Sequence, residues 1–245
     1  MKRIFALLPI LVISISAFPQ DMKDGLRLID IEKYNEATTW FQRKIDAQPT
    51  VTLYFYLAGE AQLLSGNIQK ANEYFAKGMN ADPASALFTA ANGAILAEQG
   101  KAEDAKLVYD KAFAMCTVVN DPLVLMYTAR AMMIAEVKSA DNALKIINRV
   151  ISLDKKGNMA DADFLLGIIH LELGNGGEAV RAFEHSSDKD KTSAKPYWKL
   201  GYLYTRSRAA SVAQPFYDKA LQMDLHWHQF TAIWGIFIFF PTKPK

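Results

Sequence analysis

The chain has 245 residues, of which 51% are hydrophobic and 22% charged, and its formal net charge is +2 at pH 7. This apolar content argues against a disordered chain and suffices for a substantial core in one or two domains. Lys2 and Arg3 account for the whole net charge, so the remainder carries no basic excess of the kind that nucleic-acid binding requires.

The N-terminus is predicted to be a secretory signal peptide spanning residues 1–17. Lys2 and Arg3 precede the apolar run "IFALLPILVISI", and small residues follow, ending at Ala17. The run is about twelve residues long, whereas a membrane-spanning helix needs roughly 20, so a retained anchor is the alternative interpretation. We expect export to the periplasm or cell envelope, with cleavage near Ala17.

Three columns of residues recur along the chain at intervals of 34 positions, with extra residues only near "TVVNDP" and "DKKGN". A fixed period of this length predicts a repeat architecture. The columns are Gly25, Gly59, Gly93, Gly167 and Gly201; Ala37, Ala71, Ala105, Ala143, Ala179 and Ala213; and Phe41, Phe75, Tyr109, Phe183 and Tyr217.

Each period contains two segments in which apolar residues recur at helical spacing, joined by turns at Gly66, Gly100 and Gly174. Each period is therefore predicted to be a helical hairpin in which the small residues allow close helix approach beside the aromatic. One hairpin cannot bury its apolar face alone, so the fold class is all-α, a right-handed solenoid of about six stacked hairpins. The expected repeats are 18–51, 52–85, 86–119, 124–157, 160–193 and 194–227.

The sixth period shows the pattern best, with a large residue, Leu-Gly and an aromatic in its first helix. This period contains Tyr197, Leu200, Gly201 and Tyr204, followed by Ala213, Tyr217 and Ala220, but has Leu225 where a closing proline would stand. The pattern resembles the tetratricopeptide repeat over about 210 of the 245 residues.

The resemblance implies a concave groove lined by outward positions of each first helix. Carried over to this chain, those positions are Tyr56, Glu60, Leu63, Ala90, Ala94, Ala97, Thr128, Met132, Ala135, Phe164, Ile168, Leu171, Trp198, Tyr202 and Thr205. The groove so predicted is apolar and lacks the lysines and asparagines with which family members grip acidic chaperone tails. Its aromatic side chains are typical of binding hot spots, although some of them could belong to the core instead.

Three glycines in the stretch "LELGNGGEAV" fit the spacing of a dinucleotide-binding loop at Gly174, Gly176 and Ala179. A helix rather than a strand is expected to precede them, and a helix C-terminus presents carbonyl groups, which have the wrong polarity for phosphate. Since Gly174 also matches Gly66 and Gly100 in the repeat, we predict a turn here.

Other candidate chemistry is sparse. His170 and His185 are expected to be structural or solvated, His226 and His228 lack further metal ligands, and the lone Cys116 is expected to be a small buried side chain rather than a reactive thiol. No nucleophile or metalloprotease motif occurs. We predict no enzyme activity, no cofactor, no metal and no small-molecule substrate.

The leading hypothesis is an exported interaction scaffold that binds a peptide segment or partner protein in its groove. Two alternatives remain open: the repeat arm of a larger envelope enzyme, transducer or outer-membrane-anchored protein, and a purely structural spacer.

The last residues, 228–245, depart from the rest of the chain, since no charged residue lies between Asp224 and Lys243. The apolar part is too short to span a membrane as a helix, and we do not expect membrane contact through it. A one-base shift of the reading frame forces a glycine at position 235, which is 34 beyond Gly201, and permits the string "PSLAPVYRHLGHLYF" from residue 225. We therefore predict a frameshifted seventh repeat, with a true cap or anchor as the alternative.

Overall fold

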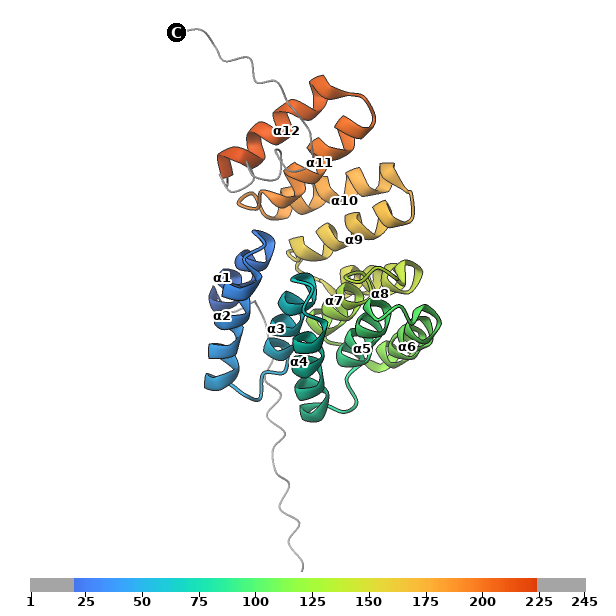
Figure 1. Cartoon of the computed structure of the whole chain (residues 1–245). Coiled ribbons are helices and arrows are strands. Elements are labelled where there is room, and N and C mark those ends of the chain that lie inside the picture. Colours follow the sequence, from blue (N-terminus) through green and yellow to red (C-terminus); the bar gives the residue numbers. More distant parts are fainter. Residues whose placement is uncertain (1–19, 224–245) are drawn as a thin grey trace, which may run out of the picture.

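The computed structural model describes residues 20–223, and the expected signal peptide and apolar tail lie outside the described residues. Within 20–223 the fold is all-α and contains no strand; its helices form six hairpins stacked as a solenoid (Figure 1). The helices are α1 (Gln20–Asp30), α2 (Tyr34–Ala47), α3 (Leu53–Leu64), α4 (Ile68–Ala81), α5 (Ala86–Glu98), α6 (Ala102–Met115), the 3-10 helix η1 (Cys116–Val118), α7 (Pro122–Ala131), α8 (Ala140–Leu153), α9 (Ala160–Glu172), α10 (Gly176–Lys189), α11 (Lys195–Arg206) and α12 (Ala210–Met223).

In five of the six hairpins between residues 20 and 223, the turn between the two helices has a left-handed backbone. Gly66, Gly100 and Gly174 have φ values of 81°, 76° and 76°, so the triple-glycine stretch is a helix-to-helix turn, as its repeat position predicts. The equivalent position is Glu32 in the first hairpin, with φ 59°, and Arg208 in the sixth, with φ 62°. Residues with a Cβ adopt this conformation at a cost, which glycine avoids.

The fourth hairpin departs from this pattern. Lys138 occupies its turn position, and no left-handed turn forms there. Instead α7 ends early and an irregular segment leads to α8, held by a hydrogen bond from the Ser139 amide to the Met132 carbonyl at 3.0 Å. The Tyr109 hydroxyl also donates to the Val137 carbonyl at 3.3 Å.

The glycine column lies against the aromatic column within the same hairpin. A Cβ built on Gly59 would lie 2.3 Å from the Phe75 ring, and one built on Gly167 would lie 2.5 Å from Phe183. Carbon atoms in contact are normally about 3.5–4.0 Å apart, so any side chain larger than hydrogen would clash. The other pairs are Gly25 with Phe41, Gly93 with Tyr109 and Gly201 with Tyr217.

The alanine column is buried throughout. The alanines of the first five hairpins are 0% exposed and Ala213 is 2% exposed; the five are Ala37, Ala71, Ala105, Ala143 and Ala179. Because interiors are close-packed, a longer side chain at any of these buried positions would have to displace its neighbours.

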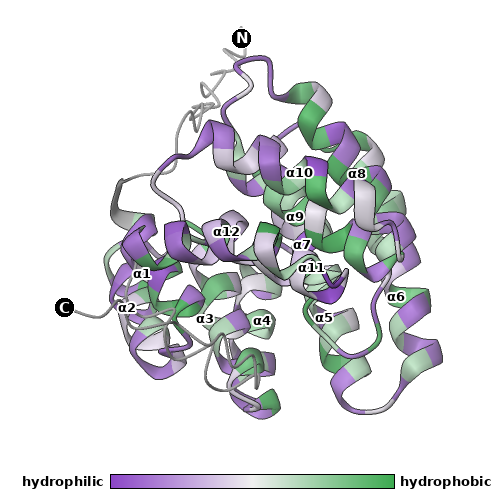
Figure 2. Cartoon of the chain, turned by 90° about the horizontal axis from the view of Figure 1, so that it is seen from above, coloured by the Kyte–Doolittle hydropathy of each residue, from purple (hydrophilic) through white to green (hydrophobic). Residues whose placement is uncertain are grey.

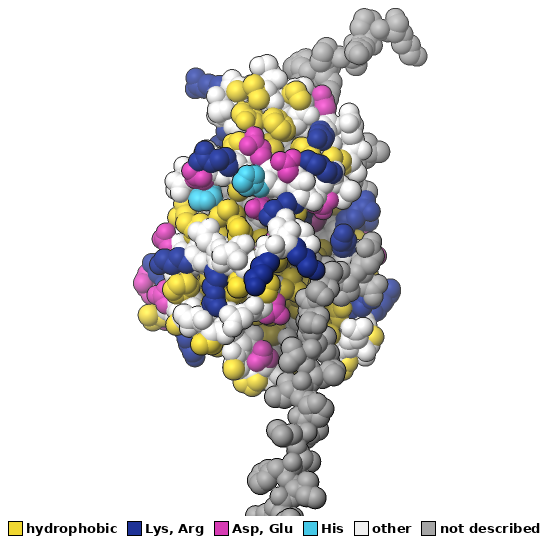
Figure 3. All heavy atoms as spheres, turned by 180° about the vertical axis from the view of Figure 1, so that it is seen from behind, with side chains coloured by type: hydrophobic (Ala, Val, Ile, Leu, Met, Phe, Trp, Pro, Cys, Tyr) yellow, Lys and Arg dark blue, Asp and Glu magenta, His cyan; other side chains and the backbone are white. Residues whose placement is uncertain are grey.

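The second helices are amphipathic: α8, for example, buries Ile146 and Ile147 and exposes Lys145, and hydrophilic and hydrophobic segments alternate along it in Figure 2. A continuous apolar core extends through the first five hairpins as far as Ile169, and smaller clusters hold the last helices together. On the face seen in Figure 3, charges of both signs are interspersed, and hydrophobic side chains gather at the end formed by the last hairpin.

Candidate protein-binding surface

The predicted groove positions lie on the first helices of hairpins two to six, which are α3, α5, α7, α9 and α11. In α3 every residue from Tyr54 to Leu63 is buried, and α5 buries nearly all of its residues from Ala86 to Ala97. Helices that are apolar on every side are packed on every side. This part of the solenoid therefore has no open inner face.

Five of the eight main groove predictions are corrected by burial: four lie in hairpins two to four, and the fifth is Trp198 in hairpin six. Tyr56, Glu60 and Met132 are 0% exposed and Leu63 is 6% exposed, so these residues belong to the interior rather than to an open groove. The neighbouring groove positions in hairpins three and four are also buried; they are Ala90, Ala94, Ala97, Thr128 and Ala135.

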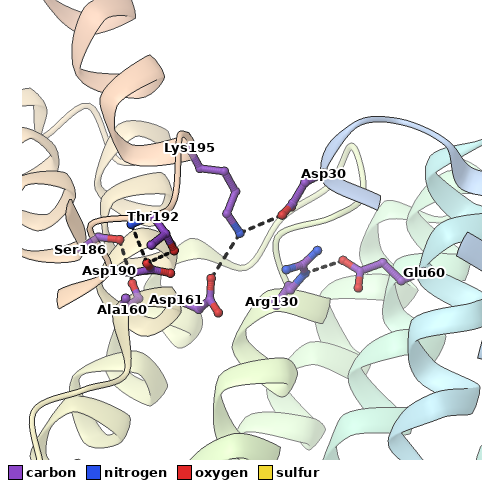
Figure 4. Close-up of polar contacts among 9 residues, drawn as sticks. All are labelled: Asp30, Glu60, Arg130, Ala160, Asp161, Ser186, Asp190, Thr192 and Lys195. Carbon is purple, nitrogen blue, oxygen red and sulfur yellow. Dashed lines mark hydrogen bonds and ion pairs between the residues drawn. The ribbon is translucent and has the colours of Figure 1, made fainter. Parts of the chain in front are cut away.

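The physical reason is that the inner sides of hairpins two and four meet. The rings of Tyr56 and Tyr127 pack edge to face with centroids 5.8 Å apart. One turn further along, Arg130 Nε donates to Glu60 Oε1 at 2.5 Å (Figure 4). Contacts between α3 and α7 thus occupy the space that an open groove would leave to a ligand.

Burial and mutual attraction shift the pKa values of both Glu60 and Arg130. Burial raises the pKa of Glu60, although the Arg130 guanidinium opposes this shift, and the Glu60 carboxylate raises the pKa of Arg130. Among the described residues, Glu60 Oε2 and the Tyr56 hydroxyl have no hydrogen-bond partner. Removing either member of the pair would leave a buried charge without compensation, which is strongly destabilising.

The remaining groove predictions lie in hairpins five and six and keep part of their surface exposed. Phe164, Ile168 and Leu171 follow one another along α9, and Tyr202 and Thr205 lie on α11. We call these five residues the exposed inner face. Trp198, the eighth main prediction, is 9% exposed and lies beneath this face.

Aromatic rings and cations alternate along this part of the molecule. The Trp198 and Tyr202 rings stack at 5.8 Å with an interplanar angle of 8°. Lys195 Nζ lies 5.3 Å from the Phe164 ring centre, and the Arg206 guanidinium lies 5.7 Å from that of Tyr202. Such cation–π contacts hold the rings in place without covering them completely.

No group of three or more His, Cys, Asp and Glu side chains between residues 20 and 223 could hold a metal ion. Cys116 is 3% exposed, and burial raises the pKa of its thiol to about 11. His185 is exposed, His170 is half-buried, and His226 and His228 lie outside the described residues.

None of the helices between residues 20 and 223 combines the length and the apolar character needed to cross a membrane.

No protein-family model matches the sequence, and no curated protein sequence matches it. Solved structures are similar in fold. Yeast Tom70 matches with a TM-score of 0.53 at 16% identity, over 81% of this chain and 42% of its own. PilW, a type IV pilus biogenesis factor, matches with a TM-score of 0.50 at 15% identity, over 87% of this chain and 96% of its own. Both are tetratricopeptide-repeat proteins.

This chain has the tetratricopeptide-repeat fold. The human IFIT1 dimer with PPP-AAAA is also similar, with a TM-score of 0.54 at 14% identity, over 87% of this chain and 54% of its own. This chain thus spans about half the length of IFIT1 and less than half that of Tom70. The tetratricopeptide-repeat positions predicted to line its groove separate into an interior set, in hairpins two to four and at Trp198, and a partly exposed set in hairpins five and six.

One sequence signal distinguishes the two sets in retrospect. The segment "LYFYLAGEAQLL" of α3 contains a single charged residue, Glu60, and has no polar side to present to water. In α11, by contrast, Lys195, Lys199 and Arg206 interrupt the apolar residues. An inner helix with no polar side indicates burial rather than a ligand groove.

Proposed function

We propose that this tetratricopeptide-repeat chain is a non-enzymatic scaffold that holds a peptide segment or partner protein against the exposed inner face of hairpins five and six. The observation that carries the proposal is the partial exposure of Phe164, Ile168 and Tyr202 on the inner helices of a repeat fold. Proteins of this fold are generally interaction scaffolds. Rigid aromatic side chains bind at a low cost in conformational entropy, which favours them as anchors.

The chemistry of the face favours a partner segment with aliphatic or aromatic side chains. Tyr202 is held from below by its stack on Trp198 and from the side by Arg206, whose Nη1 donates to the Tyr202 hydroxyl at 3.3 Å. A side chain fixed in this way loses little freedom on binding, so burying its open side contributes to affinity. Apolar groups of the partner would cover Phe164 and Ile168.

Photo-crosslinking in living cells tests this proposal. A benzophenone amino acid placed at position 202 should crosslink to a partner polypeptide that mass spectrometry can identify. The matched control carries the same group at Leu107, which is 68% exposed on α6, away from this face. Equal crosslinking from positions 107 and 202 would contradict a binding site at the exposed inner face.

A direct affinity measurement completes the test once the partner segment is known. Tyr202→Ala should weaken its binding about tenfold or more, as loss of an aromatic anchor does. Leu107→Ala should leave both the affinity and the helix content unchanged. Undiminished affinity in the Tyr202→Ala protein would place the binding surface elsewhere.

We also propose that the scaffold acts in the cell envelope after export. The support is the basic pair Lys2 and Arg3 before a short apolar run. Mass measurement of the protein recovered from an envelope fraction should show loss of residues 1–17. Recovery of the full-length chain from the cytosol would refute export.

A further inference from the structure

Five charged side chains from five different hairpins form an electrostatic network inside the solenoid (Figure 4). Besides the pair of Glu60 and Arg130, the network contains Asp30 at the end of α1, Asp161 in α9 and Lys195 at the start of α11. Within residues 20–223 these two groups are joined by no ion pair, and Arg130 acts on Asp30 and Asp161 through charge alone. The members of the network are far apart in sequence, so the network depends on the curvature of the whole repeat array rather than on any one hairpin.

Lys195 is the link between the two ends of the array. Its Nζ lies 3.1 Å from Asp30 Oδ2 and 3.2 Å from Asp161 Oδ1. Asp161 belongs to the hairpin that packs next to that of Lys195, whereas Asp30 belongs to the first hairpin. Of these two bonds, therefore, only the one with Asp30 joins the first hairpin to the last. We call these three residues the clasp.

Apolar packing contributes little at this junction. A cleft of about 330 Å³ separates α1 from the start of α11, and Arg27, Asp30, Thr192, Ser193 and Lys195 supply most of its lining. Among residues 20–223, the buried cluster of the last hairpin includes no residue of α1; its members are Ala194, Tyr197, Trp198, Ala213, Tyr217 and Ala220. Charge, rather than a shared hydrophobic core, links the two ends here.

The clasp is also open to solvent in part, since the side chains of Lys195, Asp30 and Asp161 are 20%, 26% and 47% exposed. Ion pairs with this exposure are individually weak and are screened by salt. A junction that depends on such pairs can open without unfolding the hairpins on either side, because each hairpin packs on its sequence neighbours.

We propose that the clasp of Asp30, Lys195 and Asp161 holds the first and last hairpins together and that its opening widens access to the exposed inner face. The closed solenoid restricts that face, and release of Asp30 from Lys195 lets the last two hairpins swing away from the first. The link to partner access rests on the function proposed above, whereas the clasp itself is a property of the chain alone.

Charge-reversal variants distinguish opening of the clasp from a general loss of stability. Asp30→Lys places two cations together and should open the junction, and Lys195→Glu should open it by placing three carboxylates together. Combining Asp30→Lys with Lys195→Glu restores an opposite pair and should close it again. The matched control is Asp188→Lys, which disrupts an exposed pair with Lys191 at 2.6 Å within the fifth hairpin and its following turn.

The distance between the first and last hairpins shows whether the clasp is open or closed. Spin labels at Asp24 of α1 and Gln222 of α12, both exposed, can be introduced by cysteine substitution in the full chain after Cys116→Ala. Pulsed dipolar spectroscopy should give a narrow distribution for the parent chain and Asp188→Lys, longer and broader ones for Asp30→Lys and Lys195→Glu, and recovery in the double variant. Circular dichroism should show the same helix content in all five proteins.

Salt provides an independent measurement. At about 1 M ionic strength the screening length is roughly 3 Å, against roughly 30 Å at about 0.01 M, so the parent distribution should lengthen as salt is added. Distributions that are the same in the parent chain, Asp30→Lys and Lys195→Glu would overturn the clasp.

A separate measurement tests whether opening the clasp widens access to the exposed inner face. Benzophenone crosslinking from position 202 should become faster in Asp30→Lys than in Asp188→Lys. Opening of the junction without faster crosslinking would refute control of access, even with the partner itself established. A complete absence of crosslinking at position 202 in every variant would instead count against the proposed function, and the distance data would still decide the clasp.

Discussion

Gly59→Ala should destabilise the second hairpin, because the added methyl group has no space. A Cβ at this position would lie 2.3 Å from Cε1 and 2.6 Å from Cδ1 of Phe75, far inside the usual contact distance of about 3.5–4.0 Å. The Phe75 ring has little freedom to retreat, since it is 3% exposed and stacks on Tyr56 with centroids 5.8 Å apart.

Two opposing effects determine how much Gly59→Ala changes the free energy of unfolding. Overpacking of a tight core costs about 1–3 kcal/mol. Replacing glycine by alanine inside a helix contributes about 0.5–1 kcal/mol in favour of the folded state, because alanine loses less backbone freedom on folding. We expect a net loss of about 0–2.5 kcal/mol in the free energy of unfolding.

Urea unfolding followed by circular dichroism measures this change as a lower midpoint at unchanged slope. Gly177→Ala is the matched control, because Gly177 lies in helix α10 and a Cβ there meets no atom within 4 Å. Its midpoint should stay equal or rise. A double variant with Phe75→Leu should show coupling, since the smaller side chain relieves the clash. If Gly59→Ala proves as stable as Gly177→Ala, the proposed helix contact is wrong.

Three further outcomes are expected. Arg208→Gly should raise stability by up to about 1 kcal/mol in urea unfolding, because it removes the left-handed strain from an exposed residue, and a loss of stability would contradict that reason. Lys195 lowers the pKa of Asp161, so this carboxylate stabilises the fold above the ordinary aspartate pKa and ceases to do so as pH falls through the lowered value. Lys195→Met should therefore raise the Asp161 titration midpoint seen by NMR, and an unchanged midpoint would exclude this pairing in solution. With a pKa of about 11, the Cys116 thiol should react with Ellman's reagent much more slowly in the folded protein than in urea at neutral pH, whereas equal rates would mean that the thiol is not buried.

The pairwise contacts within a hairpin could be predicted from the sequence because both partners recur at a fixed separation. Gly59 and Phe75, like Gly167 and Phe183, lie 16 positions apart. In each pair a Cβ on the glycine would overlap the aromatic ring. Local spacing determines which side chains of two consecutive helices meet, so no information from distant residues was needed.

The turn position was predicted only where glycine marks it. Glu32 and Arg208 adopt the same left-handed backbone as Gly66, but neither residue type indicates a positive φ. Their separation of 34 positions from Gly66 and Gly174 was the available signal. Lys138 shows the limit of that signal, since it occupies the same position in the fourth hairpin and the chain there follows another route.

The groove was mispredicted in its first half because it depends on curvature, which accumulates from a small rotation at each repeat. Whether Tyr56 faces water is decided by Tyr127, and whether Glu60 is paired is decided by Arg130, two hairpins later. The sequence around α3 does not indicate the total rotation that the solenoid accumulates between α3 and α7. The same inner positions remain partly exposed at Phe164 and Ile168. The curvature that buries the first inner helices also brings Asp30 to Lys195. The same geometric property of the array therefore closes the first part of the predicted groove and forms the clasp that we propose to control access to the exposed inner face.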